Sequence, residues 1–207
     1  MNLVKIFFVL RFKTQLSSFP LFSSAGKNLI FVHINKTAGS SILDYFDRKK
    51  LHLTVNEIKK IIGEKCYENA IKFCVVRNPY DRVKSLYFHR IKTGRLKSDV
   101  GINEWIIDVF DETKLSIHRT GKEKMFLPQS FWISQDKAIT INEILRFENL
   151  NEDFLAFCLK YNLPKKTLPH ANVSKRVKVI LDNRSINLIN QVFNDDFNQF
   201  GYKKILD

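Results

Sequence analysis

Two short apolar runs, each followed at once by a polar turn and a helical pattern, constrain this chain more than any other feature. The runs LIFVHI (29–34) and IKFCVVR (71–77) are rich in β-branched and aromatic residues and are bounded by polar segments, which is the pattern of buried strands. Strands that alternate with helices form βαβ units, whose strands pair in parallel. The sequence therefore predicts an α/β fold of three layers, with a central, mostly parallel sheet flanked by helices.

Capping signals place the helices around these runs. Thr54 stands three residues before Glu57, which is a capping box, and Gly63 is a suitable end for that helix. Asn78 followed by Pro79 marks the start of the helix after the second run. Further helices are expected over residues 102–112, 151–163 and 185–200, and a third strand within residues 138–150 that ends near residue 147.

The length of 207 residues indicates one domain, which we place at residues 27–207, after an N-terminal extension of residues 1–26. The extension has one apolar stretch, Ile6–Leu10, with Lys5 and Arg11 on either side. This stretch is much shorter than the ~20 residues that span a bilayer, and it is short for a signal peptide. We expect a poorly ordered or amphipathic segment that makes at most peripheral contact with a membrane.

The net charge indicates what kind of partner the protein binds, and the cysteines indicate the redox state of its compartment. Lys and Arg total 34 against 21 Asp and Glu, a formal net charge of +13 that favours an anionic partner. The basic residues are scattered and form no tail, so a concave anion site competes well with a nucleic-acid surface. The three cysteines, Cys66, Cys74 and Cys158, include no C-x-x-C pair, and their odd number argues against a closed disulfide framework. We infer a reducing compartment.

The turn after the first run, NKTAGSS (35–41), has the composition of an anion-binding loop. A helix N-terminus presents unpaired backbone N–H groups, and small residues let that backbone approach a ligand. Lys36 offers a mobile cation, and hydroxyl groups come from Thr37, Ser40 and Ser41. The two small residues are Ala38 and Gly39. The loop lacks the G-x-x-x-x-G-K-[ST] pattern of a Walker A loop. The alternative is a capped strand-to-helix turn with one solvated lysine.

The second junction, CVVRNPYDRVKS (74–85), places Arg77 at a strand end and Arg82 and Ser85 on one face of the next helix. Arg77 and Ser85 are candidates for a second phosphate, because a guanidinium fork and a hydroxyl both bind phosphate oxygens. The alternative is a surface ion pair between an arginine and Asp81, beside a neutral helical serine. Ligands gather at the carboxyl ends of parallel strands, so two such junctions favour one ligand with two separated anionic groups.

Four segments in this order resemble the P-loop-related carbohydrate sulfotransferases of the Sulfotransfer_2 type. They are FVHINKTAGSSI, FCVVRNPYDRVKSLYF, LRFENL and LPHANVSKR, and the resemblance extends from Leu29 to Tyr202. It implies a P-loop-like fold and a transferase that moves a sulfuryl group from 3′-phosphoadenosine 5′-phosphosulfate (PAPS) to a carbohydrate hydroxyl. The product 3′-phosphoadenosine 5′-phosphate (PAP) is then released, and no metal is expected. Since Golgi-type relatives carry a spanning anchor and none is visible here, we expect a cytoplasmic, bacterial enzyme of polysaccharide sulfation.

The resemblance also implies roles for individual residues. The loop Lys36–Ser41 surrounds the 5′-phosphosulfate, and Arg77 and Ser85 hold the 3′-phosphate. Lys36 is the cation that we expect to stabilise the charge developing on the bridging oxygen. HANVSKR resembles the late segment that closes over the nucleotide, with contacts from Asn172, Ser174 and Arg176.

A general base must deprotonate the acceptor hydroxyl, and His52 is the leading candidate. Relatives carry a histidine between the two nucleotide motifs, and in some of them it acts as the base. His33, beside the loop, is expected to point into the core, and an acidic residue is a further option. Two departures from the family pattern are Asn35 in place of a proline and the non-titrating residues 125–126 in place of a histidine, whose role His118 could take.

Three other functions stay open at this point. A family member could bind PAPS or PAP without turnover. A P-loop phosphotransferase would need a Walker A pattern and an acidic magnesium partner, which the sequence does not offer. A basic module for RNA or another polyanion suits the charge and the aromatic content, but no RNA-binding motif is present and nucleic acid is not the expected partner. One basic stretch could contact an acidic acceptor sugar, and a solvated loop explains it as well. This stretch contains Arg90, Lys92, Arg95 and Lys97.

Overall fold

The computed structural model describes residues 19–111, 113, 116–119, 123–136, 138–165, 167–168 and 179–206. The chain divides into two compact units, one drawn from Met1–Val75 and Ile133–Asn172 and the other from Val76–Trp132 and Val173–Asp207. A cluster of buried apolar side chains forms a core in each unit. Within the described ranges, no helix is both long enough and apolar enough to cross a bilayer.

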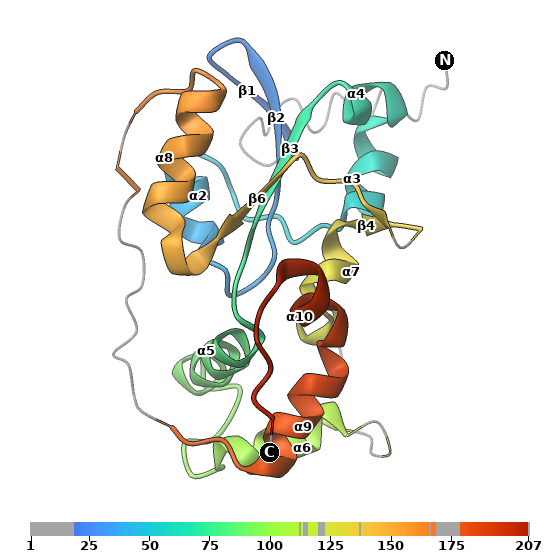
Figure 1. The fold of residues 1–207 in the computed structure, drawn as a ribbon, viewed down its shortest axis with the longest axis vertical. Helices are drawn as coiled ribbons and strands as arrows, with labels where there is room; N and C mark the ends of the chain where they lie inside the picture. Colours follow the sequence, from blue (N-terminus) through green and yellow to red (C-terminus); the bar gives the residue numbers. More distant parts are fainter. Residues whose placement is uncertain are drawn as a thin grey trace. The chain divides into compact units, whose positions relative to one another are not determined.

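A sheet with the strand order β1-β2-β3-β6 forms the centre of the first unit (Figure 1). β2 (Lys27–Val32) and β3 (Ile71–Val76) are parallel, with Val32 opposite Cys74. β1 (Leu21–Ser24), which lies within the predicted extension 1–26, is antiparallel to β2. β6 (Glu143–Arg146) lies beside β3. The predicted α/β fold with a central, mostly parallel sheet is therefore confirmed.

Helices cover both faces of this sheet. Figure 1 shows α2 (Gly39–Tyr45) and α8 (Leu150–Lys160) on one side, and α3 (Val55–Ile62) and α4 (Glu64–Glu68) on the other. The first pair packs through a core whose members come from the strands and from these two helices, including Leu29, Phe31, Ile42, Phe73, Val75, Phe154 and Phe157. Deletion of one such large side chain typically costs roughly 2–5 kcal/mol, so this core holds the strand ends in place.

The predicted helix and strand signals in this unit are largely confirmed. Thr54 and Glu57 form both bonds of the capping box, and Gly63 ends α3. The third strand, β6, ends at Arg146 and leads into the short 3-10 helix η3 (Phe147–Asn149). Earlier in the same stretch, β4 (Ser134–Gln135) and β5 (Ala138–Ile139) form a separate antiparallel pair.

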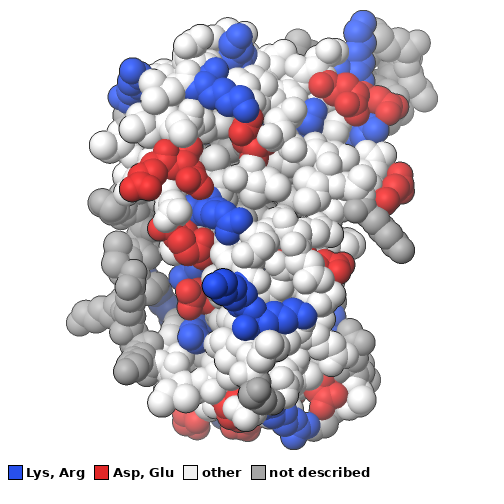
Figure 2. Space-filling model, in the orientation of Figure 1, with Lys and Arg blue, Asp and Glu red and all other residues white. Residues whose placement is uncertain are grey.

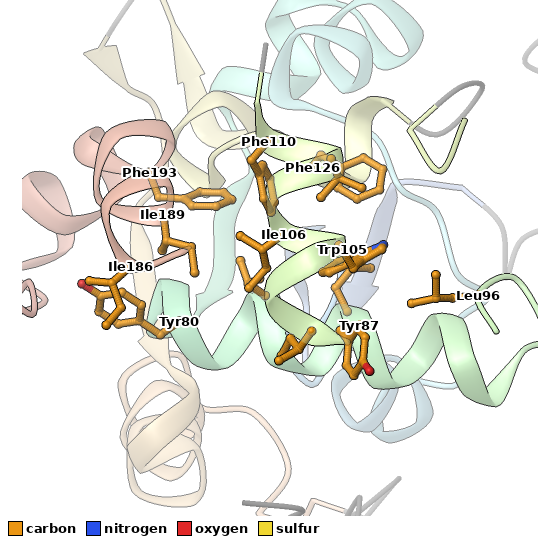
Figure 3. Packing of buried hydrophobic residues seen from close by; sticks show 14 of the residues in the cluster. Tyr80, Tyr87, Leu96, Trp105, Ile106, Phe110, Phe126, Ile186, Ile189 and Phe193 are labelled. Carbon is orange, nitrogen blue, oxygen red and sulfur yellow. The ribbon is translucent and has the colours of Figure 1, made fainter. Parts of the chain in front are cut away.

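The second unit is helical and has an aromatic core. Its elements are α5 (Pro79–Lys92), α6 (Ile102–Phe110), η2 (Glu123–Phe126), α7 (Gln129–Ile133), α9 (Asn183–Val192) and α10 (Asn194–Phe200). Figure 3 shows the rings of Trp105, Phe110, Phe126 and Phe193 close together. Phe110 meets Phe193 edge-on, with ring centroids 5.4 Å apart, which is a favoured aromatic geometry.

The prediction of one helix over residues 185–200 is wrong, because two helices occupy this stretch. The helical run is interrupted at Phe193, whose φ of −104° and ψ of 23° depart from helical values. The apolar spacing continues through the break, so the sequence pattern does not reveal it. After the break Asp196 is fully buried, and its carboxylate accepts hydrogen bonds from the backbone at residues 129 and 130. These tertiary bonds are invisible to a local pattern.

Candidate functional site

The loop between β2 and α2 has an unusual backbone. Lys36 has φ of 66° and Ala38 has φ of 62°, both in the left-handed region that non-glycine residues seldom adopt. The Thr37 hydroxyl donates to the carbonyl of Ile34 at 2.9 Å, and the Thr37 side chain is fully buried. Thr37 therefore uses its hydroxyl proton to hold the turn, whereas Lys36 and Ser40 are half-buried at the loop surface.

Gly39, the first residue of α2, makes room for His33. A Cβ built on Gly39 would overlap the His33 ring, including its Nε2 and Cδ2 atoms. The sequence had suggested that Gly39 lets a ligand approach the backbone. In the structure the space beside Gly39 holds a side chain of the protein itself, so this glycine locks the loop against the end of β2.

Substitution of Gly39 by alanine tests this packing. We expect Gly39→Ala to lower the free energy of unfolding by roughly 1–3 kcal/mol, the usual cost of overpacking. The double variant Gly39→Ala/His33→Ala should lack this added cost, because the opposing ring is gone. Gly101→Ala is the control: a Cβ there meets nothing within 4 Å, so it should lack the overpacking cost and lose only what glycine contributes as the N-cap of α6. Additive losses in urea unfolding of the double variant would contradict the proposed contact.

The rings of His33 and His52 lie against each other beside the loop, tilted by 32°. Their ring centroids are 4.2 Å apart, and His52 Nδ1 lies 3.1 Å from the carbonyl oxygen of His33. A carbonyl oxygen can only accept, so His52 carries its proton on Nδ1. In this tautomer the Nε2 atom of the exposed His52 is the ring nitrogen that carries no proton. This is the tautomer that a general base needs.

Burial keeps His33 neutral. Its side chain is only 5 % exposed, and its Nδ1 has no hydrogen-bond partner in the part of the chain that the structure describes. Desolvation is the largest cause that lowers the His33 pKa, to about 3, followed by the charges of His52 and Lys50. His33 therefore stays neutral in the pH range in which an ordinary histidine takes up a proton.

The low pKa of His33 predicts a pH-dependent stability. The unfolded chain binds a proton at an ordinary pKa of 6.5 and the folded chain at about 3, so stability falls as the pH drops through this window. Between pH 7 and pH 5, wild type should lose roughly 2 kcal/mol more than His33→Gln, since this group contributes up to about 1.4 kcal/mol per pH unit. Urea unfolding of both proteins at the two pH values measures the difference. Equal losses would show that His33 is protonated in the fold.

Arg77 and Ser85 belong to the second unit. Arg77 directly follows β3, and α5 begins at Pro79 after an Asn78 cap whose side chain accepts from the Tyr80 N–H at 3.0 Å, as predicted. Ser85 is half-buried on α5. The main chain of Arg77 is fixed by the Gln129 side chain, which is hydrogen-bonded to both its N–H and its carbonyl.

Arg82 does not share an exposed face with Ser85. Its guanidinium is buried, donates to the carbonyls of Leu127 at 3.0 Å and Met125 at 3.2 Å, and has its pKa lowered by burial to about 10. The alternative of a surface pair between an arginine and Asp81 is also wrong, because the partner is Lys84 at 3.8 Å. Arg82 is a structural residue.

The remaining sequence candidates fall into three groups. Asn172, Ser174 and Arg176, like His170, lie outside the described residues. His118 is held through its carbonyl, which accepts from Arg90 Nη2 at 2.7 Å. Arg90 is itself buried and so drops out of the basic acceptor patch. Among the described residues, no group of three or more His, Cys, Asp or Glu side chains is arranged to hold a metal ion.

Gln129 is a residue that was not among the site candidates from the sequence. A lone glutamine after a proline carries no periodic or capping signal, and its partner Arg77 lies 52 positions away. The residues just before it explain one departure from the family pattern. Met125 contributes a carbonyl to Arg82, and Phe126 lies in the core with the Arg90 guanidinium 5.6 Å from its ring centre.

The fold and the loop define a class: an α/β protein with a lysine-bearing, anion-suited turn at the end of a parallel strand. A family model described as Sulfotransferase family, Sulfotransfer_2, matches residues 20–203. The chain therefore belongs to the sulfotransferase family, as its motifs predicted. Comparison with curated proteins and with solved structures gives no significant match.

Proposed function

We propose that the protein transfers a sulfuryl group from PAPS to a hydroxyl of a carbohydrate acceptor. The observation that carries this proposal is the family match over residues 20–203, nearly the whole chain. Sulfotransferases generally use PAPS as the donor. The carbohydrate acceptor rests on the resemblance of four ordered motifs to carbohydrate sulfotransferases.

The residues of the first loop suit the anionic end of this donor. The backbone of Lys36 and Ala38 is left-handed, and turns of this kind can form concave nests of N–H groups that favour anions. The proposed contacts to the 5′-phosphosulfate are the Lys36 ammonium, the Ser40 and Ser41 hydroxyls and the backbone of Thr37, Ala38 and Gly39. The proposed contacts to the 3′-phosphate are Arg77 and Ser85, with Asn172, Ser174 and Arg176 closing over the nucleotide.

In the proposed reaction, two side chains act on the transferring group and the acceptor. PAPS supplies the sulfuryl group: the bond from sulfur to the bridging oxygen breaks as a bond from sulfur to the acceptor oxygen forms, and PAP leaves. His52 Nε2 accepts the proton of the acceptor hydroxyl, since Nδ1–H is engaged with the His33 carbonyl. The Lys36 ammonium stabilises negative charge near the bridging oxygen.

On the face drawn in Figure 2, the surface charge favours a small anionic ligand over a long nucleic acid. Figure 2 shows Lys and Arg scattered over this face and interspersed with Asp and Glu, rather than gathered in one tract. Nucleic-acid proteins usually concentrate positive charge in a stripe or patch. The exposed basic residues Lys92, Arg95 and Lys97 are the candidates for contact with an acidic sugar.

Calorimetry and a transfer assay test the proposal together. Purified protein should bind PAP much more tightly than ATP or single-stranded RNA, and radiolabelled sulfate from PAPS should appear on a member of a polysaccharide panel without added magnesium. Equal affinity for PAP and ATP would overturn the donor assignment. Tight PAP binding with no transfer to any carbohydrate, but with transfer to a phenol or a peptide, would overturn the acceptor class.

A further inference from the structure

The buried Gln129 side chain is hydrogen-bonded to both main-chain polar groups of Arg77. The Arg77 N–H donates to Gln129 Oε1 at 2.9 Å, and Gln129 Nε2 donates to the Arg77 carbonyl at 2.8 Å. Gln129 is fully buried. Both main-chain polar groups at the end of β3 are thus satisfied by one amide, much as a neighbouring strand would satisfy them.

Asp196 orients that amide. Its carboxylate accepts from Gln129 Nε2 at 3.1 Å and from the backbone N–H groups of Gln129 and Ser130, each at 2.8 Å. Asp196 is fully buried, and a carboxylate accepts but does not donate. The NH₂ end of the Gln129 amide must therefore face Asp196 and the Arg77 carbonyl, which leaves Oε1 to receive the Arg77 N–H.

Arg82 anchors the same network from the other side. It donates to the carbonyls of Leu127 and Met125, immediately before Gln129, and its charge lies near enough to Asp196 for the two to attract. Burying a carboxylate and a guanidinium is costly unless every donor and acceptor is used. The network ends on the main chain of Arg77, so it fixes the direction in which the Arg77 side chain leaves the backbone.

We propose that Gln129, oriented by Asp196, is a positioning residue that aims Arg77 at the 3′-phosphate of the nucleotide. The inference rests on the proposed function, which assigns Arg77 to that phosphate. The backbone torsions of Arg77 set where its Cβ points, and a guanidinium fork binds phosphate well only when it is aligned. A misaligned fork should lose the 3′-phosphate while leaving the rest of the nucleotide site intact.

The test compares PAP with adenosine 5′-phosphate, which lacks the 3′-phosphate. In calorimetry, Arg77→Ala should reduce the ratio of PAP affinity to adenosine 5′-phosphate affinity by roughly tenfold, the scale of one charge-assisted phosphate contact. Gln129→Met, which keeps the length but removes the amide, should reduce the same ratio. The double variant Arg77→Ala/Gln129→Met should match Arg77→Ala alone, because Gln129 acts only through Arg77. Asp196→Asn should lower the ratio in the same direction, and it replaces Gln129→Met if that variant does not fold.

Asn142 provides a matched control. It bonds to both main-chain polar groups of Lys72, near the other end of β3. Asn142 Oδ1 accepts from the Lys72 N–H at 2.8 Å, and the Asn142 backbone N–H donates to the Lys72 carbonyl at 2.9 Å. Asn142→Ala should lower stability yet keep the wild-type affinity ratio. If Gln129→Met and Asp196→Asn keep that ratio while Arg77→Ala lowers it, the positioning role is wrong and the proposed function stands. If Arg77→Ala itself keeps the ratio, the assignment of the 3′-phosphate fails.

Discussion

Lys36→Ala is expected to lower the rate of sulfuryl transfer by roughly 10²–10³-fold, the usual loss when one preorganised charge-stabilising group is removed. The lysine lies in a turn whose backbone conformation is rare, and this backbone sets the direction in which its side chain leaves the loop. Alanine keeps the β-carbon, and the strain at φ of 66° is therefore unchanged. The loss is a loss of charge and not of loop geometry.

Steady-state kinetics with saturating acceptor separate the two ways in which Lys36 could act. If the charge matters mainly in the transition state, kcat falls and the affinity for PAP changes much less. Lys27→Ala is the control, since Lys27 is an exposed lysine at the start of β2, and it should keep the wild-type rate. A Lys36→Ala enzyme with wild-type kcat would remove Lys36 from the reaction.

His52→Ala is expected to reduce transfer by roughly 10²–10⁴-fold, the range for loss of a general base, with PAP affinity unchanged. His52 contacts His33 through their neighbouring rings and through the Nδ1 bond to its carbonyl, and these contacts orient Nε2. Removal of the ring should therefore affect proton transfer and leave the nucleotide contacts in place.

Rescue by free imidazole distinguishes a missing base from a damaged fold. Imidazole added to His52→Ala should restore part of the rate in a concentration-dependent way, because the vacated space beside His33 can admit a small base. His118→Ala is the matched control and should behave as wild type, since His118 is bonded to Arg90 only through its carbonyl. A large loss in His118→Ala with full activity in His52→Ala would reverse the assignment.

The position and composition of the anion loop were readable from the sequence, whereas its internal roles were not. Lys36 and Ser40 remain at the loop surface as the pattern suggested. Thr37 and Gly39, counted as ligand-facing groups, are used by the protein itself, one in a bond to Ile34 and the other as space for His33. A local pattern specifies which chemical groups a turn offers, but not which of them the surrounding structure consumes.

Short-range physics explains what the sequence by itself determined. Strand runs, the capping box at Thr54, the Asn78 cap and the end of β6 depend on residues within a few positions of one another, so apolar period and cap chemistry suffice to place them. Family membership likewise follows from ordered motifs along the chain. These features indicated the α/β class and two candidate anion-binding junctions without any knowledge of packing.

Only the tertiary structure decided the rest. It paired Gln129 with Arg77 across 52 positions and with Asp196 across 67, buried Arg82 against the carbonyls before Gln129, and broke the last helix at Phe193. The hydrogen bonds of Gln129 and Arg82 join polar groups that share no local pattern. Their contact is set by how the helices pack, because a buried donor or acceptor must find a partner wherever the fold provides one.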